Sequence, residues 1–362
     1  MINFMLWTKK EGAVAFARVV PVILLMITFF SACSSLSHKL DRQAWNEYRA
    51  KFITLSGRVI DTGQCGVSHS EGQGFAMLLA VAHNDKTTFL QLWEWTQAHL
   101  QIRQDRLFAW RWNPADHPPV KDTNNASDGD ILIAWALFRA ADKWRLKKLR
   151  KSANEIVLAI KNNLIYQSSV GPVLLPGING FQDAKGVDIN LSYWIYPAFI
   201  EFDKQQPDVL WRELINSGLS LLEKARFGRW QLPPDWLRLE SNMVLSDKYP
   251  PRFSFDAVRI PLYLSWGGLN DSAILKPFLS FWDVQKTKNY LPAWTNLNDD
   301  DVAQYAISPG AYKVFELMRH TINEEHIVDD QGKLKLDVKD EDYYSNSLSL
   351  LARLAAVDAK LP

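Results

Sequence analysis

The chain has 362 residues, 47% of them hydrophobic, which is enough apolar surface for a large core in one or several domains. Its 41 Lys and Arg balance 40 Asp and Glu, which excludes the strongly basic class of nucleic-acid-binding proteins, and we expect no nucleic-acid partner. The 15 Trp are unusual: most would fill a core, but a minority exposed in a groove would suit a neutral, ring-shaped substrate.

The N-terminus has the features of an export signal. Basic residues precede an apolar run, residues 19–30, which ends at small residues around Cys33. This order is typical of a secretory signal peptide, and the run is shorter than the roughly 20 apolar residues of a membrane-spanning helix. We therefore predict a signal peptide over residues 1–33 and a periplasmic or secreted protein, with an uncleaved anchor as the alternative.

The residues before Cys33 also resemble a bacterial lipoprotein processing site, with Phe30 where Leu is usual. Lipidation of Cys33 would make the protein an outer-membrane lipoprotein, and it is the one membrane contact we expect. Cys65 is the only other cysteine, so no disulfide framework is predicted.

The sequence contains none of the common cofactor motifs. Its histidines are scattered without an HExxH or paired spacing, and neither a P-loop nor a GxGxxG motif after a strand is present. We therefore expect no metal, nucleotide or redox cofactor.

From about residue 43 onward, the chain has apolar residues at helical spacing and no low-complexity linker or charge block. Strand-like alternation is sparse, so we predict an all-α fold and a single catalytic domain over residues 34–362. The spacing permits these helices to close into a ring but does not require it. In chain order, the predicted helices span residues 71–83, 87–100, 130–144, 151–164, 193–202, 209–224, 257–266, 272–284, 310–320 and 343–356.

The first acidic residue at a predicted helix start is Glu71. Ser70 is the expected N-cap, with Gln73 completing a capping box, and Gly72 and Gly74 leave the backbone open to close approach. Taken alone, Glu71 could simply complement the helix dipole.

Two further sites share this pattern. Asp128 and Asp130 precede an apolar helix; one of them could be a plain N-cap, and a calcium loop is an alternative that lacks its other ligands. Asp256 lies among apolar and aromatic residues, where a carboxylate needs a partner, and Arg259 lies three residues later on the same helix face. An ordinary Asp–Arg pair is the alternative here.

Together, these segments resemble glycoside hydrolase family 8. Residues 126–137 closely match the signature of that family, residues 70–74 resemble its acid motif, and residues 254–259 resemble its base motif. More narrowly, the chain is similar to the periplasmic endoglucanases associated with bacterial cellulose synthase. Shorter matching segments, in the order of the family, are residues 57–61, 109–112, 174–177, 234–236 and 342–344.

The resemblance implies an (α/α)6 barrel of six inner and six outer helices and an endo-1,4-β-glucanase that acts with inversion. Glu71 would be the general acid, Asp256 the general base, and Asp128 would hold and distort the sugar at subsite −1. Inverting hydrolysis needs an acid and a base about 6.5–9.5 Å apart, with a water between. Glu71 must stay protonated, which burial or the charge of Asp128 would favour, and Arg259 would keep Asp256 ionised.

Further residues are candidates for binding the sugar. Tyr193 and Tyr344 are expected hydrogen-bond partners, Arg259 lies beside the base, and Trp110 and Trp112 are candidate stacking platforms for which core packing is the alternative. The expected partner is β-1,4-glucan, bound by a monomer that acts in cellulose biosynthesis and contacts the cellulose synthase machinery.

Other functions remain open. Xylan, mixed-linkage β-glucan and chitosan are alternative substrates within the family, and chitosan would favour extra acids in the groove, where the sequence shows no dense acidic cluster. A non-catalytic polysaccharide-binding protein is a further alternative, against which the intact set of acids argues. A polysaccharide lyase would need cations facing uronates, and no such cluster is evident.

Overall fold

The computed structural model describes residues 40–284, 290–322 and 342–360, all of which belong to one compact unit, Leu36–Pro362. The predicted signal peptide, residues 1–33, and the candidate lipidation site Cys33 lie outside the described residues. Within the described ranges, no helix combines the length and the apolar character needed to cross a membrane.

Helices dominate this part of the chain, which confirms the predicted helical class. They are α1 (Arg42–Phe52), α2 (Ser70–Ala82), α3 (Lys86–His99), α4 (Ser127–Trp144), α5 (Lys147–Asn163), α6 (Tyr196–Gln205), α7 (Val209–Lys224), α8 (Ile260–Trp266), α9 (Ser272–Val284), α10 (Pro309–Thr321) and α11 (Tyr343–Asp358). Three single 3-10 turns accompany them: η1 (Thr62–Gln64), η2 (Leu191–Tyr193) and η3 (Ala257–Arg259).

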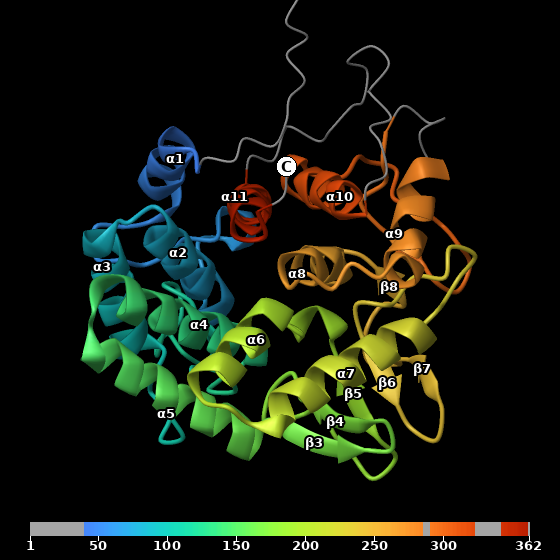
Figure 1. Cartoon of the computed structure of the whole chain (residues 1–362), viewed down its shortest axis with the longest axis horizontal. Helices are drawn as coiled ribbons and strands as arrows, with labels where there is room; N and C mark the ends of the chain where they lie inside the picture. The colour runs from blue at the N-terminus through green and yellow to red at the C-terminus, as the bar shows by residue number, and fades with distance from the viewer. Residues whose placement is uncertain (1–39, 285–289, 323–341, 361–362) are drawn as a thin grey trace, which may run out of the picture. The chain divides into compact units, whose positions relative to one another are not determined.

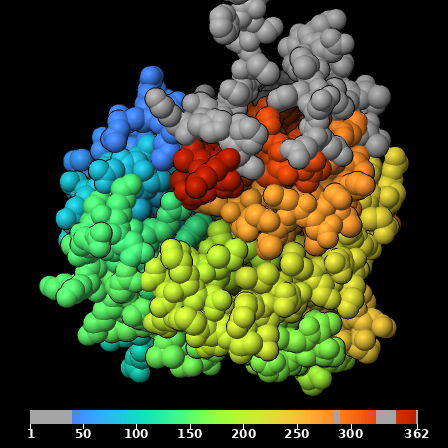
Figure 2. All heavy atoms as spheres, in the orientation of Figure 1, coloured from blue at the N-terminus to red at the C-terminus, as the bar shows by residue number. Residues whose placement is uncertain are grey.

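The helices pack in a closed cycle (Figure 1). Helix α2 packs on α4, α4 on α6, α6 on α8, and α11 closes the cycle between α8 and α2, while α10 packs on both α8 and α11. The remaining helices pack outside this cycle: α1 on α11, α3 on α2, α5 on α4, α7 on α6, and α9 on α7 and α10. In the same view, atoms fill the space that the ribbons leave open at its centre (Figure 2).

Side-chain burial explains which helices lie inside the cycle. In α2, 11 of 13 residues are buried, and in α4, 14 of 18. The outer helices α5 and α7 bury only 6 of 17 and 6 of 16 residues. A helix that is apolar all round must be covered on all sides, whereas an amphipathic helix needs only one covered face.

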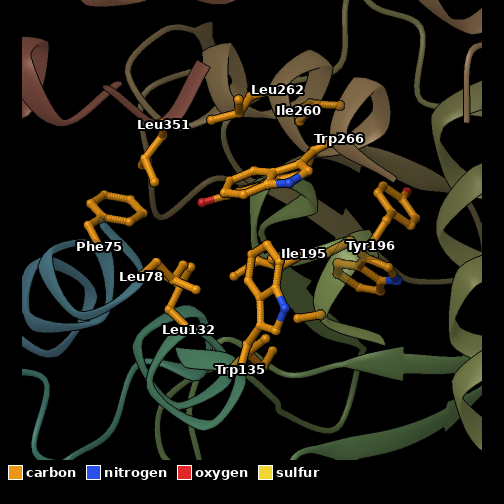
Figure 3. Packing of buried hydrophobic residues seen from close by; sticks show 14 of the residues in the cluster. Phe75, Leu78, Leu132, Trp135, Ile195, Tyr196, Ile260, Leu262, Trp266 and Leu351 are labelled. Atoms are coloured by element: carbon orange, nitrogen blue, oxygen red, sulfur yellow. The ribbon is translucent and has the colours of Figure 1, made fainter. Parts of the chain in front are cut away.

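Large apolar side chains fill the centre of the cycle (Figure 3). The rings of Trp135 and Trp266, both buried, lie 4.8 Å apart at an interplanar angle of 60°. Truncating such a buried Trp to Ala typically costs about 3–5 kcal/mol. Labelled with them in Figure 3 are Phe75 and Leu78 of α2, Leu132 of α4, Tyr196 of α6, Ile260 and Leu262 of α8, Leu351 of α11, and Ile195.

Most predicted helix bounds lie within three residues of the observed ones, and α7 and α9 agree at both ends. The first turn of the helix predicted over residues 257–266 is the 3-10 turn η3, and α8 follows with Pro261 in its first turn. Helix α1 was not predicted, although Trp45, Tyr48 and Phe52 form its buried face at helical spacing.

Short antiparallel strands hold the loops that precede the inner helices. They are β1 (Ser68–His69), β2 (Arg111–Trp112), β3 (Ile165–Ser168), β4 (Gly171–Leu174), β5 (Val187–Ile189), β6 (Leu237–Leu239), β7 (Met243–Leu245), β8 (Arg252–Phe253) and β9 (Thr295–Asn296). They form four sheets: β1 with β2, β3 with β4, β5-β6-β7, and β8 with β9. Strand β1 runs directly into α2, and its pairing of His69 with Arg111 fixes the loop that carries Trp110 beside the start of that helix.

Candidate active site

A cavity of about 540 Å³ lies where several of the inner helices begin. This volume falls in the usual range for small-molecule sites. The cavity is lined by Asp61, Gly63, Gln64, His69, Ser70, Glu71, Trp110, Ala126, Asp128, Tyr193, Phe255, Asp256, Arg259, Asp342, Tyr343 and Tyr344. The fold therefore brings together all three predicted acids and four of the five predicted binding residues.

Glu71 and Asp128 are each the second residue of an inner helix, α2 and α4. The two helix starts approach closely because Gly129 has no side chain: a Cβ there would lie 2.1 Å from Ser70 Oγ and 2.8 Å from the Glu71 backbone nitrogen. Gly72 likewise faces Tyr343, whose hydroxyl would lie 2.4 Å from an added Cβ. The close approach predicted at Gly72 is confirmed, as is that predicted at Gly74, where an added Cβ would lie 2.5 Å from Leu132 Cβ; the approach at Gly129 was not predicted.

The predicted capping box at Ser70 is wrong. His69 occupies the N-cap position and Ser70 is already helical, because pairing of β1 with β2 fixes the entry to α2. The Gln73 side chain instead turns into the core, where its Oε1 accepts from Val59 N (2.7 Å) and its Nε2 donates to Thr96 Oγ1 (2.8 Å).

Asp128 is buried, and its Oδ1 accepts from the backbone N–H of Gly129 at 2.7 Å. Burial raises the pKa of Asp128 to about 7. Neither Asp128 nor Asp130 is the N-cap of α4, since Ala126 occupies that position.

Asp130 does not line the cavity and acts as a structural acceptor. It is fully buried, and its oxygens accept from Phe108 N (2.9 Å) and Asn125 Nδ2 (2.7 Å). Burial, with a smaller contribution from the charge of Asp128, raises the pKa of Asp130 to about 7. Its role is to tie the segment before β2 to the start of α4.

Asp256 lies in the turn before α8, and the predicted pair with Arg259 is confirmed. Arg259 Nη2 donates to Asp256 Oδ1 at 2.8 Å. The pKa of Asp256 nevertheless lies well above its ordinary value, because burial and the charges of Asp235 and Asp128 outweigh the hydrogen bonds from Asn190 and Trp236. The Arg259 contact alone therefore does not hold the pKa of Asp256 low, because burial and two neighbouring carboxylates raise it.

Arg259 is the common partner of all three acids. Its side chain is only 3% exposed, and besides Asp256 its Nη1 contacts Glu71 and lies 3.5 Å from Asp128 Oδ2. The sequence suggested only burial and a neighbouring carboxylate around Glu71, whereas the fold adds a guanidinium. The cluster thus consists of three carboxylates around one cation.

The aromatic residues divide into two groups. Trp110 lines the cavity, with its ring stacked on His69 at 5.8 Å and its indole N–H donating to Asp122 at 2.8 Å. Trp112 does not line the cavity; it is half-buried and packs edge-on against Trp95 at 5.6 Å, against the border of the core.

Tyr193 and Tyr344 both line the cavity, as Asp256 does. The Tyr344 hydroxyl donates to the Phe255 carbonyl at 2.6 Å, and the ring of Tyr193 faces the Arg259 guanidinium at 5.7 Å. Phe255 was not predicted as a site residue, although it directly precedes Asp256. Its 54% exposed ring offers an apolar surface inside the cavity.

Two further carboxylates reach the cavity, Asp61 and Asp342. They come from opposite ends of the described chain, and the charge of Asp342 contributes to a raised pKa of Asp61, for which burial is the main cause. A dense acidic cluster is therefore present, contrary to the expectation from sequence, because folding gathers acids that are far apart along the chain.

Comparison with known proteins identifies the family of the chain. Residues 14–358 match the family described as glycosyl hydrolases family 8. The chain is 37% identical over 319 residues to a probable endoglucanase of Novacetimonas hansenii, covering 87% of this chain and 91% of that relative. It is 41% identical over 276 residues to an endoglucanase of Cellulomonas uda, covering 76% of each chain.

Its structure also resembles a solved one, that of the endoglucanase Cel10 from Klebsiella pneumoniae, described as a family 8 glycosyl hydrolase. The TM-score is 0.80 and the identity 39%, with 87% of this chain and 99% of that chain covered.

Proposed function

The chain belongs to glycosyl hydrolase family 8, and on that premise we propose that it is an endo-1,4-β-glucanase that hydrolyses β-1,4-glucan with inversion at the anomeric carbon. One observation carries this proposal: three carboxylates, Glu71, Asp128 and Asp256, converge on one guanidinium in the wall of an aromatic-lined cavity. Such a wall can bind a neutral sugar ring and supply both an acid and a base.

We assign the fold to the (α/α)6 barrels. In this assignment α2, α4, α6, α8, α10 and α11 form the inner ring, and α1, α3, α5, α7 and α9 belong to the outer one. The closed cycle of contacts supports it. Because the acids lie at amino ends of inner elements, the partial positive charge of the helix dipole favours negative charge developing there.

In the proposed reaction, Glu71 donates its proton to the glycosidic oxygen as the bond to the anomeric carbon breaks. A water on the opposite face of the sugar forms the new bond to that carbon and gives a proton to Asp256. Asp128 contacts the sugar between them, and its charge stabilises the positive charge that develops on the ring. One product then has a free 4-hydroxyl and the other a new, inverted reducing end.

The electrostatics of the cluster support this division of roles. Three carboxylates around a single guanidinium cannot all ionise at low cost, and burial raises the pKa of Asp128 to about 7, so the cluster holds a proton close to neutral pH while Asp256 serves as the base. The cluster can therefore supply the proton that Glu71 needs, even though Arg259 contacts Glu71.

Chitosan is a second candidate substrate. Asp61 and Asp342 add negative charge to the cavity beyond the three central acids, and the amines of chitosan would complement it. Activity on chitosan would keep the mechanism and change the substrate.

The test is release of reducing ends from soluble cellulose, mixed-linkage β-glucan, xylan and chitosan by the purified protein. We expect activity on the glucans and a loss of at least about 10³-fold in Glu71→Gln, because the leaving oxygen is then not protonated. Glu94→Gln, an exposed glutamate on α3, is the matched control and should keep wild-type activity. A folded protein that is silent on every polymer would instead be a polysaccharide-binding protein.

The cellular role is proposed on the sequence alone. Residues 1–33 would direct export, with lipidation of Cys33 as the alternative to cleavage, and the mature monomer would trim glucan beside the cellulose synthase. Metabolic labelling with a fatty acid, in the wild type and in Cys33→Ser, would separate a lipoprotein from a soluble exported enzyme. Cellulose yield after deletion of the gene would test the link to biosynthesis.

A further inference from the structure

Asp235 lies directly behind the turn that carries the proposed base. Its Oδ1 accepts from the backbone N–H groups of Ser254 (2.9 Å) and Ala257 (2.8 Å), and its Oδ2 accepts from the Ser254 hydroxyl. Its own N–H donates to the Arg252 carbonyl at 2.7 Å, which anchors it to β8. One carboxylate thus holds both ends of the turn 254–257.

The hydrogen bonds of Asp235 replace the side-chain cap that the N-cap residue of a helical turn usually provides. Asp256 occupies the N-cap position of η3, where an aspartate side chain usually accepts the free N–H groups of the first turn. Among the described residues, the Asp256 side chain makes no such capping bond, and its carboxylate instead meets Arg259 in the cavity. The N–H of Ala257, the first residue of the turn, goes to Asp235.

From this exchange we infer that Asp235 is a positioning residue that caps the start of η3 in place of Asp256 and so leaves the Asp256 carboxylate free to face the substrate. The inference rests on the proposed role of Asp256 as the base. It assigns a role to the Pro-Asp-Trp segment 234–236, which matched the family pattern but had no function. Asp235 is 7% exposed and does not line the cavity, so it acts only through the turn and through its charge.

The charge of Asp235 has a consequence for the base. It is one of the causes that raise the pKa of Asp256, after burial. A neutral residue at position 235 should therefore let Asp256 ionise at lower pH, while a purely structural change would leave the titration of the base where it is.

The kinetic test compares Asp235→Asn with the wild type on soluble glucan between pH 4 and pH 9. We expect kcat to fall by about 10- to 100-fold with KM almost unchanged, since a misplaced reacting group affects turnover more than binding. We also expect the acid limb of the pH profile to move to lower pH. Ser254→Ala, which removes one donor and keeps the charge, should lower kcat less and leave the limb in place.

Asp85→Asn is the matched control. Asp85 caps α3 by accepting from Thr88 N and Thr88 Oγ1, a backbone and a hydroxyl donor of the kinds that Asp235 also uses, and it also accepts from Trp45 Nε1 and Arg49 Nη1. It lies just after the end of α2 that is opposite Glu71. This variant should lose stability and keep the wild-type kcat and acid limb. An unshifted acid limb in Asp235→Asn, or an equal loss of kcat in Asp85→Asn, would overturn the inference.

A crystal structure of Asp235→Ala gives a readout that does not depend on turnover. We expect the Asp256 carboxylate to rotate back and accept from its own first turn, away from Arg259. If the wild type cleaves no polymer, the proposed function fails, but this structure still decides the capping role. An Asp256 side chain that keeps its place beside Arg259 in the variant would contradict it.

Discussion

At the scale of single residues, the chemistry of the site depends on charges that come from distant parts of the chain. The sequence identified Glu71, Asp128 and Asp256 because each lies in a short family motif. It also identified the Asp256–Arg259 pair because that contact spans only three residues. The contact of Arg259 with Glu71 and the cap from Asp235 could not be predicted, since both depend on how separate helices and loops pack.

The raised pKa of Asp256 predicts the pH dependence of the reaction. The base must be ionised to accept a proton, so activity is lost as the pH falls through its pKa, which lies well above the ordinary value of 3.8. The acid limb of kcat/KM should therefore lie well above pH 4, measured on soluble glucan from pH 3 to pH 9. A limb close to pH 4 would show that Asp256 ionises as freely as an exposed aspartate.

The buried hydrogen bonds of Asp130 predict that its substitution affects stability and not catalysis. In Asp130→Asn an amide NH2, which accepts no hydrogen bond, replaces a carboxyl oxygen that faces Phe108 N or Asn125 Nδ2 and keeps acceptor capacity even when protonated. We expect a loss of about 1–3 kcal/mol in the free energy of unfolding at pH 5. Urea denaturation measures this loss. Asp142→Asn, at the other end of α4 and half exposed, should cost under about 1 kcal/mol.

The same variant should show a defined pH dependence. The pKa of Asp130 is about 7 in the folded protein against 3.8 in the unfolded chain, so the folded state holds a proton that the unfolded state has lost between these values. The wild type therefore loses this contribution to stability as the pH rises from about 4 to about 7, whereas the amide of the Asp130→Asn variant does not titrate. The penalty of the substitution should shrink from pH 5 to pH 8, and a constant penalty would contradict the raised pKa.

At the scale of elements, the helix starts place the acids, and two glycines allow those starts to meet. Apolar spacing predicted most of the helices because burial on the inner faces is periodic. It did not predict how α2 begins: His69, not Ser70, is the N-cap, because a two-residue strand pairs with Arg111–Trp112. Strands this short leave little alternation to detect in a sequence.

Gly129→Ala tests the close approach of α2 and α4. The new Cβ would lie 2.1 Å from Ser70 Oγ and 2.8 Å from Glu71 N, so the helix starts must move apart. We expect a loss of about 1–3 kcal/mol in stability and a fall in kcat larger than the change in KM, because Glu71 and Asp128 would be displaced relative to each other. Unfolding and steady-state kinetics measure the two effects; wild-type kcat in this variant would show that the approach does not matter for catalysis.

At the scale of the whole molecule, the helices pack in a closed cycle, and the site is formed by the loops and the helix starts of that cycle. The helical class followed from the spacing of apolar residues, but closure could be expected only from resemblance to the family, because periodicity fixes which face is buried and not which helix covers it. The gathering of Asp61 and Asp342 beside the three central acids is likewise a property of closure. The charge of the cavity, and with it the preferred substrate, therefore depends on the fold and not on the amino-acid composition.

The measurement that tests the central claim most directly is ¹H NMR of the first products formed from a short β-1,4-gluco-oligosaccharide. The two-carboxylate inverting reaction predicts that the newly formed reducing end appears as the α-anomer and only later mutarotates to the β-anomer. If the β-anomer appears first, one of the carboxylates must act as a nucleophile, and the roles assigned to Glu71, Asp128 and Asp256 would be wrong.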